Sequence, residues 1–156
     1  MSIALTLRDF MARQGIHYDV VMHPQTKSSM ETAEAAHIPG DALAKAVILE
    51  DEDGYVMAVV PATHYVNLGM LRKQLRRVLR LATERDLARI FGDCTAGAIP
   101  PFGMIYGLPT VVDDALAKHA DLYFEAGDHE ELIHLDGGEF DALFAHAQHG
   151  SFSRHA

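Results

Sequence analysis

The apolar residues at the start of the chain recur every three or four positions and then change to alternation. The helical spacing is set by Ile3, Leu7, Phe10 and Met11. This spacing predicts an amphipathic helix, and Gly15 is placed to end it. The segment HYDVVMH at 17–23 alternates as a half-buried strand does and stops at Pro24. We therefore expect a helix and then a strand before residue 24.

A capping pattern and a hairpin follow this first strand. Ser28 and Glu31 have the spacing of a capping box and predict a short helix that stops at the IPG sequence of 38–40. The segment AKAVILEDEDGYVMAVVPA at 44–62 contains two apolar strands around a DEDG turn at 51–54. A strand that is apolar on both faces is interior in its sheet. We therefore expect this hairpin to be central.

The segment LGMLRKQLRRVLR at 68–80 has a helical pattern in which the basic side chains point away from one apolar face. The apolar face consists of Leu68, Leu71, Leu75, Val78 and Leu79. Thr83 and Asp86 match a weaker capping pattern and predict a further helix that Gly92 ends. A loop rich in glycine and proline comes next.

Three strands and a last helix are predicted beyond this loop. They are TVVD at 110–113, DLYFEAG at 121–127, ELIHL at 131–135 and the helix EFDALFAHA at 139–147. Clustered strands with interspersed helices favour an α/β (α+β) fold with a mixed, largely antiparallel sheet and surrounding helices over a doubly wound parallel one. We expect a single domain at 1–146 and a flexible, frayed tail at 147–156.

Composition narrows the class of protein. The 156 residues suffice for one domain, and a single cysteine, Cys94, excludes an internal disulfide and suits a reducing compartment. Arg8 and Asp9 interrupt the apolar pattern at the start, so neither a signal sequence nor a membrane span is predicted. We therefore expect a cytoplasmic protein without a membrane partner.

The charge is uneven along the chain. The net charge of −9 argues against a protein that coats nucleic acid electrostatically, and no DNA partner is expected. Seven basic residues and only two acidic ones nevertheless lie within 71–90. Such a stripe is usually a solvated face, but it is compatible with local contact to a polyanion.

Neither a metal nor a protein nucleophile is predicted. The sequence HEELIH at 129–134 differs from the zinc-protease pattern because its second histidine comes one residue late, off the ligating face. Cys94 fits a buried apolar thiol better than a nucleophile. The sequence GSFS at 150–153 lacks the strand and helix of a nucleophile elbow. We therefore assign no metal ligand and no cofactor.

Two features have both a structural and a functional interpretation. Lys45 stands at the head of an interior strand, where a lysine either extends to water or anchors a phosphate or carboxylate in a cavity. The loop GAIPPFG at 97–103 is either a plain connection or a rigid rim whose backbone N–H groups, from Gly97 and Ala98, face a ligand oxygen. The residues alone leave both pairs of alternatives open.

Taken in order, several fragments between Tyr18 and Phe144 resemble the YbaK/prolyl-tRNA synthetase-associated editing domain family. They are HP at 23–24, TAEAAHI at 32–38, LAKAVIL with Lys45, GYVMAVVPA at 54–62, the G-x-x-x-P loop from Gly97 to Pro101, PTVVDDAL at 109–116 and FEAGDHEELIHL at 124–135 with His129. Each fragment is weak, but their order and spacing together are specific.

The resemblance implies an α/β fold with a mixed sheet and hydrolysis of the ester of a mischarged aminoacyl-tRNA. It places Lys45 near the terminal phosphates and His129 at the pocket rim. The loop around the aminoacyl ester comprises Gly97, Ala98, Ile99, Pro100 and Pro101. His23, Arg72 and Arg76 are further candidates for substrate binding, the two arginines as a guide for the acceptor stem.

The implied activity is that of a freestanding deacylase that acts in trans on the acceptor end of mischarged tRNA. Alanyl- or cysteinyl-tRNA(Pro) is the first candidate substrate, and an aminoacyl-tRNA synthetase is a candidate partner. An activated ester requires only a placed water and a stabilised oxyanion, and the terminal hydroxyl of the tRNA is thought to assist in this family. The alternatives are an inactive module of the same fold that binds tRNA, a nucleotide or an amino acid, and a metal-dependent hydrolase.

Overall fold

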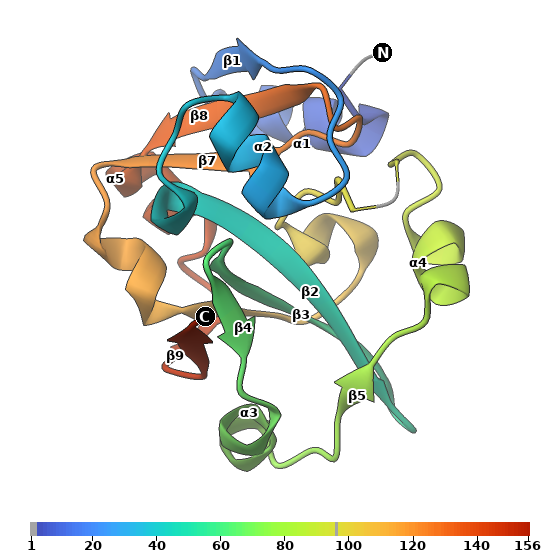
Figure 1. Ribbon diagram of the computed structural model, residues 1–156. Helices are drawn as coiled ribbons and strands as arrows, with labels where there is room; N and C mark the ends of the chain where they lie inside the picture. The colour runs from blue at the N-terminus through green and yellow to red at the C-terminus, as the bar shows by residue number, and fades with distance from the viewer. Residues whose placement is uncertain (1–2, 96) are drawn as a thin grey trace.

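The computed structural model describes residues 3–95 and 97–156 and has the β2–β3 hairpin at its centre (Figure 1). The helices are α1 (Leu5–Gln14), α2 (Ser29–Ala35), α3 (Leu68–Leu75), α4 (Glu84–Ile90) and α5 (Gly137–Leu143). The strands are β1 (Asp19–Met22), β2 (Leu43–Asp51), β3 (Gly54–Pro61), β4 (His64–Val66), β5 (Arg80–Leu81), β6 (Thr110–Asp113), β7 (Asp121–Glu125), β8 (Glu131–Asp136), β9 (Gln148–Gly150) and β10 (Ser153–His155). Short 3-10 helices occupy Gly40–Ala42, Gly103–Tyr106 and Asp114–Lys118.

The main sheet has the order β1-β8-β7-β2-β3-β6-β9, and β5 pairs separately with β2. The pairs β1–β8, β7–β8, β2–β3 and β2–β5 are antiparallel, whereas β2–β7, β3–β6 and β6–β9 are parallel. Strands β4 and β10 form a separate antiparallel pair. The predicted α/β fold with a mixed, largely antiparallel sheet is therefore confirmed.

The central hairpin forms as its sequence predicts. Its register runs from Ala44 opposite Pro61 to Asp51 opposite Gly54. The Asp51 side chain accepts a hydrogen bond of 2.8 Å from the Asp53 N–H, and Gly54 has a φ of 129°, which favours glycine. The acidic turn is thus stabilised locally, and the two apolar strands can pack on both faces.

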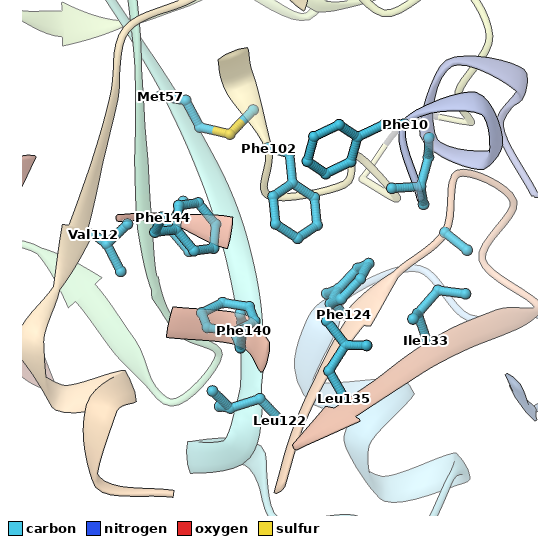
Figure 2. Close-up of a cluster of buried hydrophobic side chains, with 14 of the residues drawn as sticks. Phe10, Met57, Phe102, Val112, Leu122, Phe124, Ile133, Leu135, Phe140 and Phe144 are labelled. Carbon is cyan, nitrogen blue, oxygen red and sulfur yellow. The ribbon is translucent and has the colours of Figure 1, made fainter. Parts of the chain in front are cut away.

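Helices α1 and α5 cover one face of the sheet, and α2 and α3 cover the other. On the first face Phe102 lies among Phe10, Phe124, Phe140 and Phe144, with ring centroids 5.0–6.2 Å from its own (Figure 2). Opposite them, separate clusters join α3 and α2 to the sheet through Leu71 and Ala33, respectively. Alternate residues of β2 thus enter different cores.

The predicted helix starts and ends are mostly confirmed. Gly15 ends α1 with a left-handed φ of 63°. The hydroxyls of Ser28 and Thr83 accept hydrogen bonds from the third backbone N–H beyond each, at the starts of α2 and α4. None of the described helices is both long and apolar enough to cross a membrane.

The predicted helix at 68–80 is too long. Helix α3 ends at Leu75, because Arg76 adopts a left-handed φ of 55° and the chain turns back. The turn leaves Val78 exposed, although the helical pattern places it on the apolar face, and brings Leu79 into the core. Residues 80–81 then form β5, which pairs with the far end of β2.

The end of the chain also differs from the prediction of a frayed tail at 147–156. Strand β9 pairs in parallel with β6, and β10 pairs with β4. Between them Phe152 is fully buried, and its N–H donates to the Asp113 carboxylate at 3.0 Å. The prediction failed because residues 147–156 are mostly polar, and the one large apolar residue among them, Phe152, is enough to pack the segment against the core.

Candidate functional site

One edge of strand β2 is paired at the two ends of the strand and not in its middle. On that edge β7 pairs with Leu43 and Ala44, and β5 pairs with Leu49 and Glu50. Within the described residues no strand pairs with 45–47 on this edge (Figure 1). The sheet therefore has an internal gap beside Lys45.

A pocket of about 320 Å³ opens at this gap. Strand β2 forms its floor, and the N-terminal end of α2, the segment 81–87 and the loop at 97–99 form its walls. The polar side chains in its lining are Lys27, Ser28, Ser29, Lys45, Glu84 and Glu125. The pocket is therefore a mixed polar and apolar site, with the lysine on its floor.

Lys45 is half-buried in this setting. Its Nζ donates a long hydrogen bond of 3.4 Å to the Ala62 carbonyl, and among the described residues no carboxylate lies within 4.0 Å of it. Burial lowers the pKa of Lys45 below its ordinary value of 10.5. A partly desolvated ammonium with donors to spare is suited to bind an anion.

The loop that follows residue 96 forms the rim beside Lys45. Gly97 is exposed and has a φ of 79°, and Ile99 also lines the pocket. Ala98 differs from the prediction, because it is fully buried and its N–H donates to the Thr95 carbonyl at 3.0 Å. The loop thus uses the Ala98 N–H for its own turn and does not offer it to a ligand.

A buried cluster of His23, Glu125 and His129 lies behind this rim. The Glu125 carboxylate lies between the rings, with Oε1 3.3 Å from His23 Nε2 and Oε2 2.6 Å from His129 Nδ1. All three residues are less than 7% exposed. A Cβ built on Gly97 would lie only 2.8 Å from His129 Nε2. The cluster therefore supports the rim from below.

Local geometry explains how His129 reaches this position. The residue follows a glycine turn and has a φ of 59°, which is uncommon for a residue with a side chain. Asp128, which is 1% exposed, holds the turn because its Oδ1 accepts from the N–H groups of Glu130 and Glu131 at 3.0 and 2.9 Å. The turn aims the His129 ring inward, toward Glu125.

The predicted site residues therefore fall into separate groups. Lys45, Gly97 and Ile99 line the pocket. His23, Ala98, Pro100, Pro101 and His129 are buried behind it. His129 therefore lies beneath the rim and not at the rim, where the resemblance places it.

The two predicted guide arginines lie elsewhere. The Arg72 guanidinium donates twice to the Leu79 carbonyl, at 3.0 and 2.8 Å. Arg76 borders a different hollow, next to Asp51 and the hairpin turn. Neither arginine lines the pocket at Lys45, since that hollow lies at the far end of β2.

Sequence reasoning missed Glu125, which lines the pocket and joins the two histidines. A signal was present, because Glu125 is an acidic residue at the end of the apolar strand DLYFE, directly before a glycine turn. A buried carboxylate at a strand end requires a polar partner. The partner could not be identified from the sequence, since His23 lies more than a hundred residues away.

The features that suggested other chemistry have ordinary roles. Burial raises the pKa of the Cys94 thiol to about 12, which does not suit a nucleophile. His134 of the HEELIH sequence lies on β8 with its ring nitrogens 3.1 and 2.8 Å from Asp19 and Asp121. No group of three or more histidine, cysteine or acidic side chains in the described part of the chain is placed to hold a metal ion.

Known proteins share this fold along nearly its whole length. A family model described as the aminoacyl-tRNA editing domain matches residues 23–143. A solved structure described as a candidate trans-editing enzyme for prolyl tRNA synthetase has a TM-score of 0.84 and 24% identity, over 97% of this chain and 96% of that chain. Hypothetical protein APE2540 has a TM-score of 0.85 and 18% identity, over 96% and 99%. No curated protein matches the sequence. At these identities the structural likeness shows the fold.

Proposed function

Because this chain belongs to the aminoacyl-tRNA editing domain family, we propose that it hydrolyses the ester bond of mischarged aminoacyl-tRNA in trans. The observation that carries the proposal is the position of Lys45, half-buried on the floor of a pocket and without a carboxylate partner among the described residues. A terminal nucleotide bears a phosphate and an acylated ribose. The pocket offers the Lys45 ammonium to the phosphate and the glycine rim to the acylated ribose.

In the proposed complex the Lys45 ammonium binds the phosphate on the 5′ side of the terminal adenosine. The acyl carbonyl then lies beside Gly97, where the missing Cβ allows the backbone to approach closely. Water attacks the carbonyl carbon, the ester C–O bond breaks, and the ribose oxygen leaves with a proton. The products are the free amino acid and an intact tRNA.

This reaction does not depend on a protein nucleophile. An aminoacyl ester is already activated, so placing the water and stabilising the oxyanion supply the main part of the catalysis. The neighbouring ribose hydroxyl of the substrate can relay the proton. His129 acts as a positioning residue in this proposal, because its ring lies behind Gly97 and does not line the pocket. Glu125 holds that ring through His129 Nδ1, and its carboxylate also lines the pocket.

Alanyl- and cysteinyl-tRNA(Pro) are the first substrates to test, since one structurally similar protein is described as a candidate trans-editing enzyme for prolyl tRNA synthetase. A panel of mischarged tRNAs would be incubated with the protein, and loss of the acyl ester would be followed beside a reaction without protein. We expect faster loss for at least one mischarged tRNA and no acceleration for correctly charged prolyl-tRNA. Equal rates with and without protein across the panel would refute the deacylase.

A binding module without turnover is the second candidate. It is favoured by the described pocket lining, which contains no histidine, cysteine or tyrosine and whose carboxylates are those of Glu84 and Glu125. Both candidates predict that a ligand binds at Lys45, which for a module that binds tRNA is the acceptor end. Only the deacylase predicts turnover, so the same panel separates them when binding of uncharged tRNA is measured in parallel.

A further inference from the structure

A second hollow, of about 280 Å³, meets the pocket at Lys45. It is bounded by Met30 of α2, by the segment 62–65 and by the end of the chain at 155–156. Lys45 lines both hollows. A ligand that contacts the Lys45 ammonium can therefore extend to either side of it. The terminal adenosine of the proposed function occupies only the first pocket and leaves the second hollow empty.

The chemistry of the second hollow is set by a relay that ends at His64. Asp113 is 3% exposed, and its carboxylate accepts hydrogen bonds from the Ala115 and Phe152 N–H groups and from the Ser153 hydroxyl at 2.8 Å. Since a hydroxyl has one proton, the Ser153 oxygen must then accept from His64 Nδ1, which lies 2.8 Å away. His64 is thus held in the tautomer that carries its proton on Nδ1.

The other nitrogen of His64 is consequently a hydrogen-bond acceptor. Burial lowers the pKa of His64 below its ordinary value of 6.5, so the ring is neutral at pH 7 and Nε2 has a free lone pair. A neutral nitrogen of this kind does not attract a phosphate. It binds a group that donates a proton, such as a hydroxyl.

The remaining groups around the hollow suit a nucleotide. Tyr65 is 52% exposed and presents an aromatic ring against which a base can stack. Arg154 is its cross-strand partner on β10 and is also exposed. Asp41 lies at the edge of the hollow, 3.6 Å from His155 Nε2, and accepts from the Thr63 hydroxyl. Its carboxylate repels a phosphate from the hollow and leaves Lys45 as the phosphate site.

We propose that the second hollow binds the ribonucleotide that precedes the terminal adenosine, with its 2′-hydroxyl donating to His64 Nε2 and its base against Tyr65. This inference rests on the proposed function, which places the terminal adenosine in the first pocket. Lys45 then binds the phosphate that links the two nucleotides. The site distinguishes RNA from DNA, because only RNA has the 2′-hydroxyl.

The test measures binding of short oligonucleotides and needs no turnover. Wild-type protein is titrated with the RNA tetramer ACCA and with the same tetramer carrying 2′-deoxycytidine at the penultimate position. We expect the deoxy substitution to weaken binding roughly five- to tenfold, the usual effect of one lost hydrogen bond. The same substitution one nucleotide further from the 3′ end is the control, and it should have no effect.

Protein variants then assign the effect to His64. In His64→Ala both tetramers should bind equally, at the weaker affinity, whereas His146→Ala, an exposed histidine at another hollow, should bind as wild type does. Ser153→Ala keeps the His64 ring but removes the group that fixes its tautomer, so the difference between tetramers should shrink. Thermal unfolding of each variant checks that the β4–β10 pair is intact.

The outcomes separate this inference from the proposed function. An undiminished deoxy effect in a folded His64→Ala variant would overturn the inference, and so would equal binding of both tetramers, or no binding of either, by the wild-type protein. Hydrolysis of a mischarged tRNA without the ribose effect would retain the deacylase and reject the second site. The ribose effect without hydrolysis would retain the second site and reject the deacylase.

Discussion

Lys45 and the arginines that follow α3 are positive charges at opposite ends of strand β2, and their surroundings differ. The Lys45 ammonium is half-buried on a pocket floor, with the Ala62 carbonyl 3.4 Å away and no carboxylate within 4.0 Å among the described residues. At the other end Arg77 donates twice to Asp51, at 2.7 and 2.6 Å, and Arg80 lies 3.3 Å from Glu50.

The difference shows that the density of positive charge along a sequence does not by itself indicate which cations remain available to a ligand. The arginines near the hairpin turn largely bind the protein itself, and each such contact removes donors that RNA would need. Lys45 is a single cation, but its donors are available and partly desolvated, which strengthens its attraction for a phosphate. Four substitutions and one pH titration test whether this contrast holds.

The largest loss of kcat/KM is expected for the variant Lys45→Ala. If Lys45 binds the terminal phosphate, loss of this charge-assisted contact should lower kcat/KM for mischarged tRNA by about 100-fold. Lys73→Ala, an exposed lysine on α3, is the matched control and should change kcat/KM by less than about twofold. Equal activity of wild type and Lys45→Ala on every substrate would reject the anchoring role.

A smaller loss is expected for Gly97→Ala. The added Cβ would lie 2.8 Å from His129 Nε2, and the φ of 79° is strained for alanine, so the rim must shift. We expect kcat/KM to fall by about tenfold, with a modest loss of thermal stability, because Gly97 is exposed but Ala98 and His129 beside it are buried. Gly107→Ala has the same φ of 79° with open space around it and is the control for strain alone. A similar loss in both variants would contradict a specific role for the rim.

The affinity for RNA should also depend on the charge of Lys45. Burial lowers the pKa of this lysine below 10.5, so its positive charge is present at neutral pH and is lost as pH rises through that lowered value. Binding of the uncharged tetramer ACCA should therefore weaken several-fold as pH rises from neutral toward 10.5, the ordinary pKa of lysine. Lys45→Ala should show a flat profile, and the same slope in both proteins would contradict the assignment.

Substitution of Arg77 should affect stability and not activity. Its guanidinium lowers the pKa of the Asp51 carboxyl to about 2 from 3.8, so the pair stabilises the fold above pH 3.8 and loses this contribution as pH falls toward 2. Arg77→Ala should lower the melting temperature by a few degrees at pH 7. The difference from wild type should shrink on acidification, and a constant difference would show that packing, not charge, is responsible.

The smallest effect is expected for Arg76→Ala. Arg76 borders the hollow at the hairpin turn and lies away from the pocket at Lys45. We expect kcat/KM for mischarged tRNA to remain within about twofold of wild type at physiological salt. A tenfold loss would instead show that the acceptor stem reaches this end of β2, and Arg76 would then contact RNA as Lys45 is proposed to do.

Local signals in the sequence predicted most of the fold. The hairpin turn at 51–54 and the cap at Ser28 depend on contacts between residues two or three positions apart, so their patterns are visible in a short window. The early end of α3 instead accompanies the left-handed turn at Arg76 and the contact of Arg77 with Asp51, which joins distant segments. A helical pattern of leucines cannot reveal such a competing contact.

Part of the candidate site could also be predicted, where it depends on patterns that are visible in a short window of sequence. The positions of Lys45 and Gly97 in the pocket lining follow from recognisable sequences, an interior strand and a loop bounded by glycines. Their roles in binding and catalysis stay predictions. The contacts of Glu125 with His23 and His129 could not be predicted, because burial of a histidine depends on which residues pack over it. The internal turn of Ala98 was missed as well, since a backbone hydrogen bond within a loop leaves no trace in residue types.

The parallel strand β9 has a practical consequence for handling this protein. It covers the outer edge of β6, and the residues after it seat Phe152 in the core. Removal of the residues after Ala147 would leave the backbone N–H and C=O groups of β6 unpaired and an apolar cavity where Phe152 packs. An exposed strand edge of this kind can pair with strands of neighbouring molecules. Shortened versions should therefore precipitate, and affinity tags are better fused at the opposite terminus.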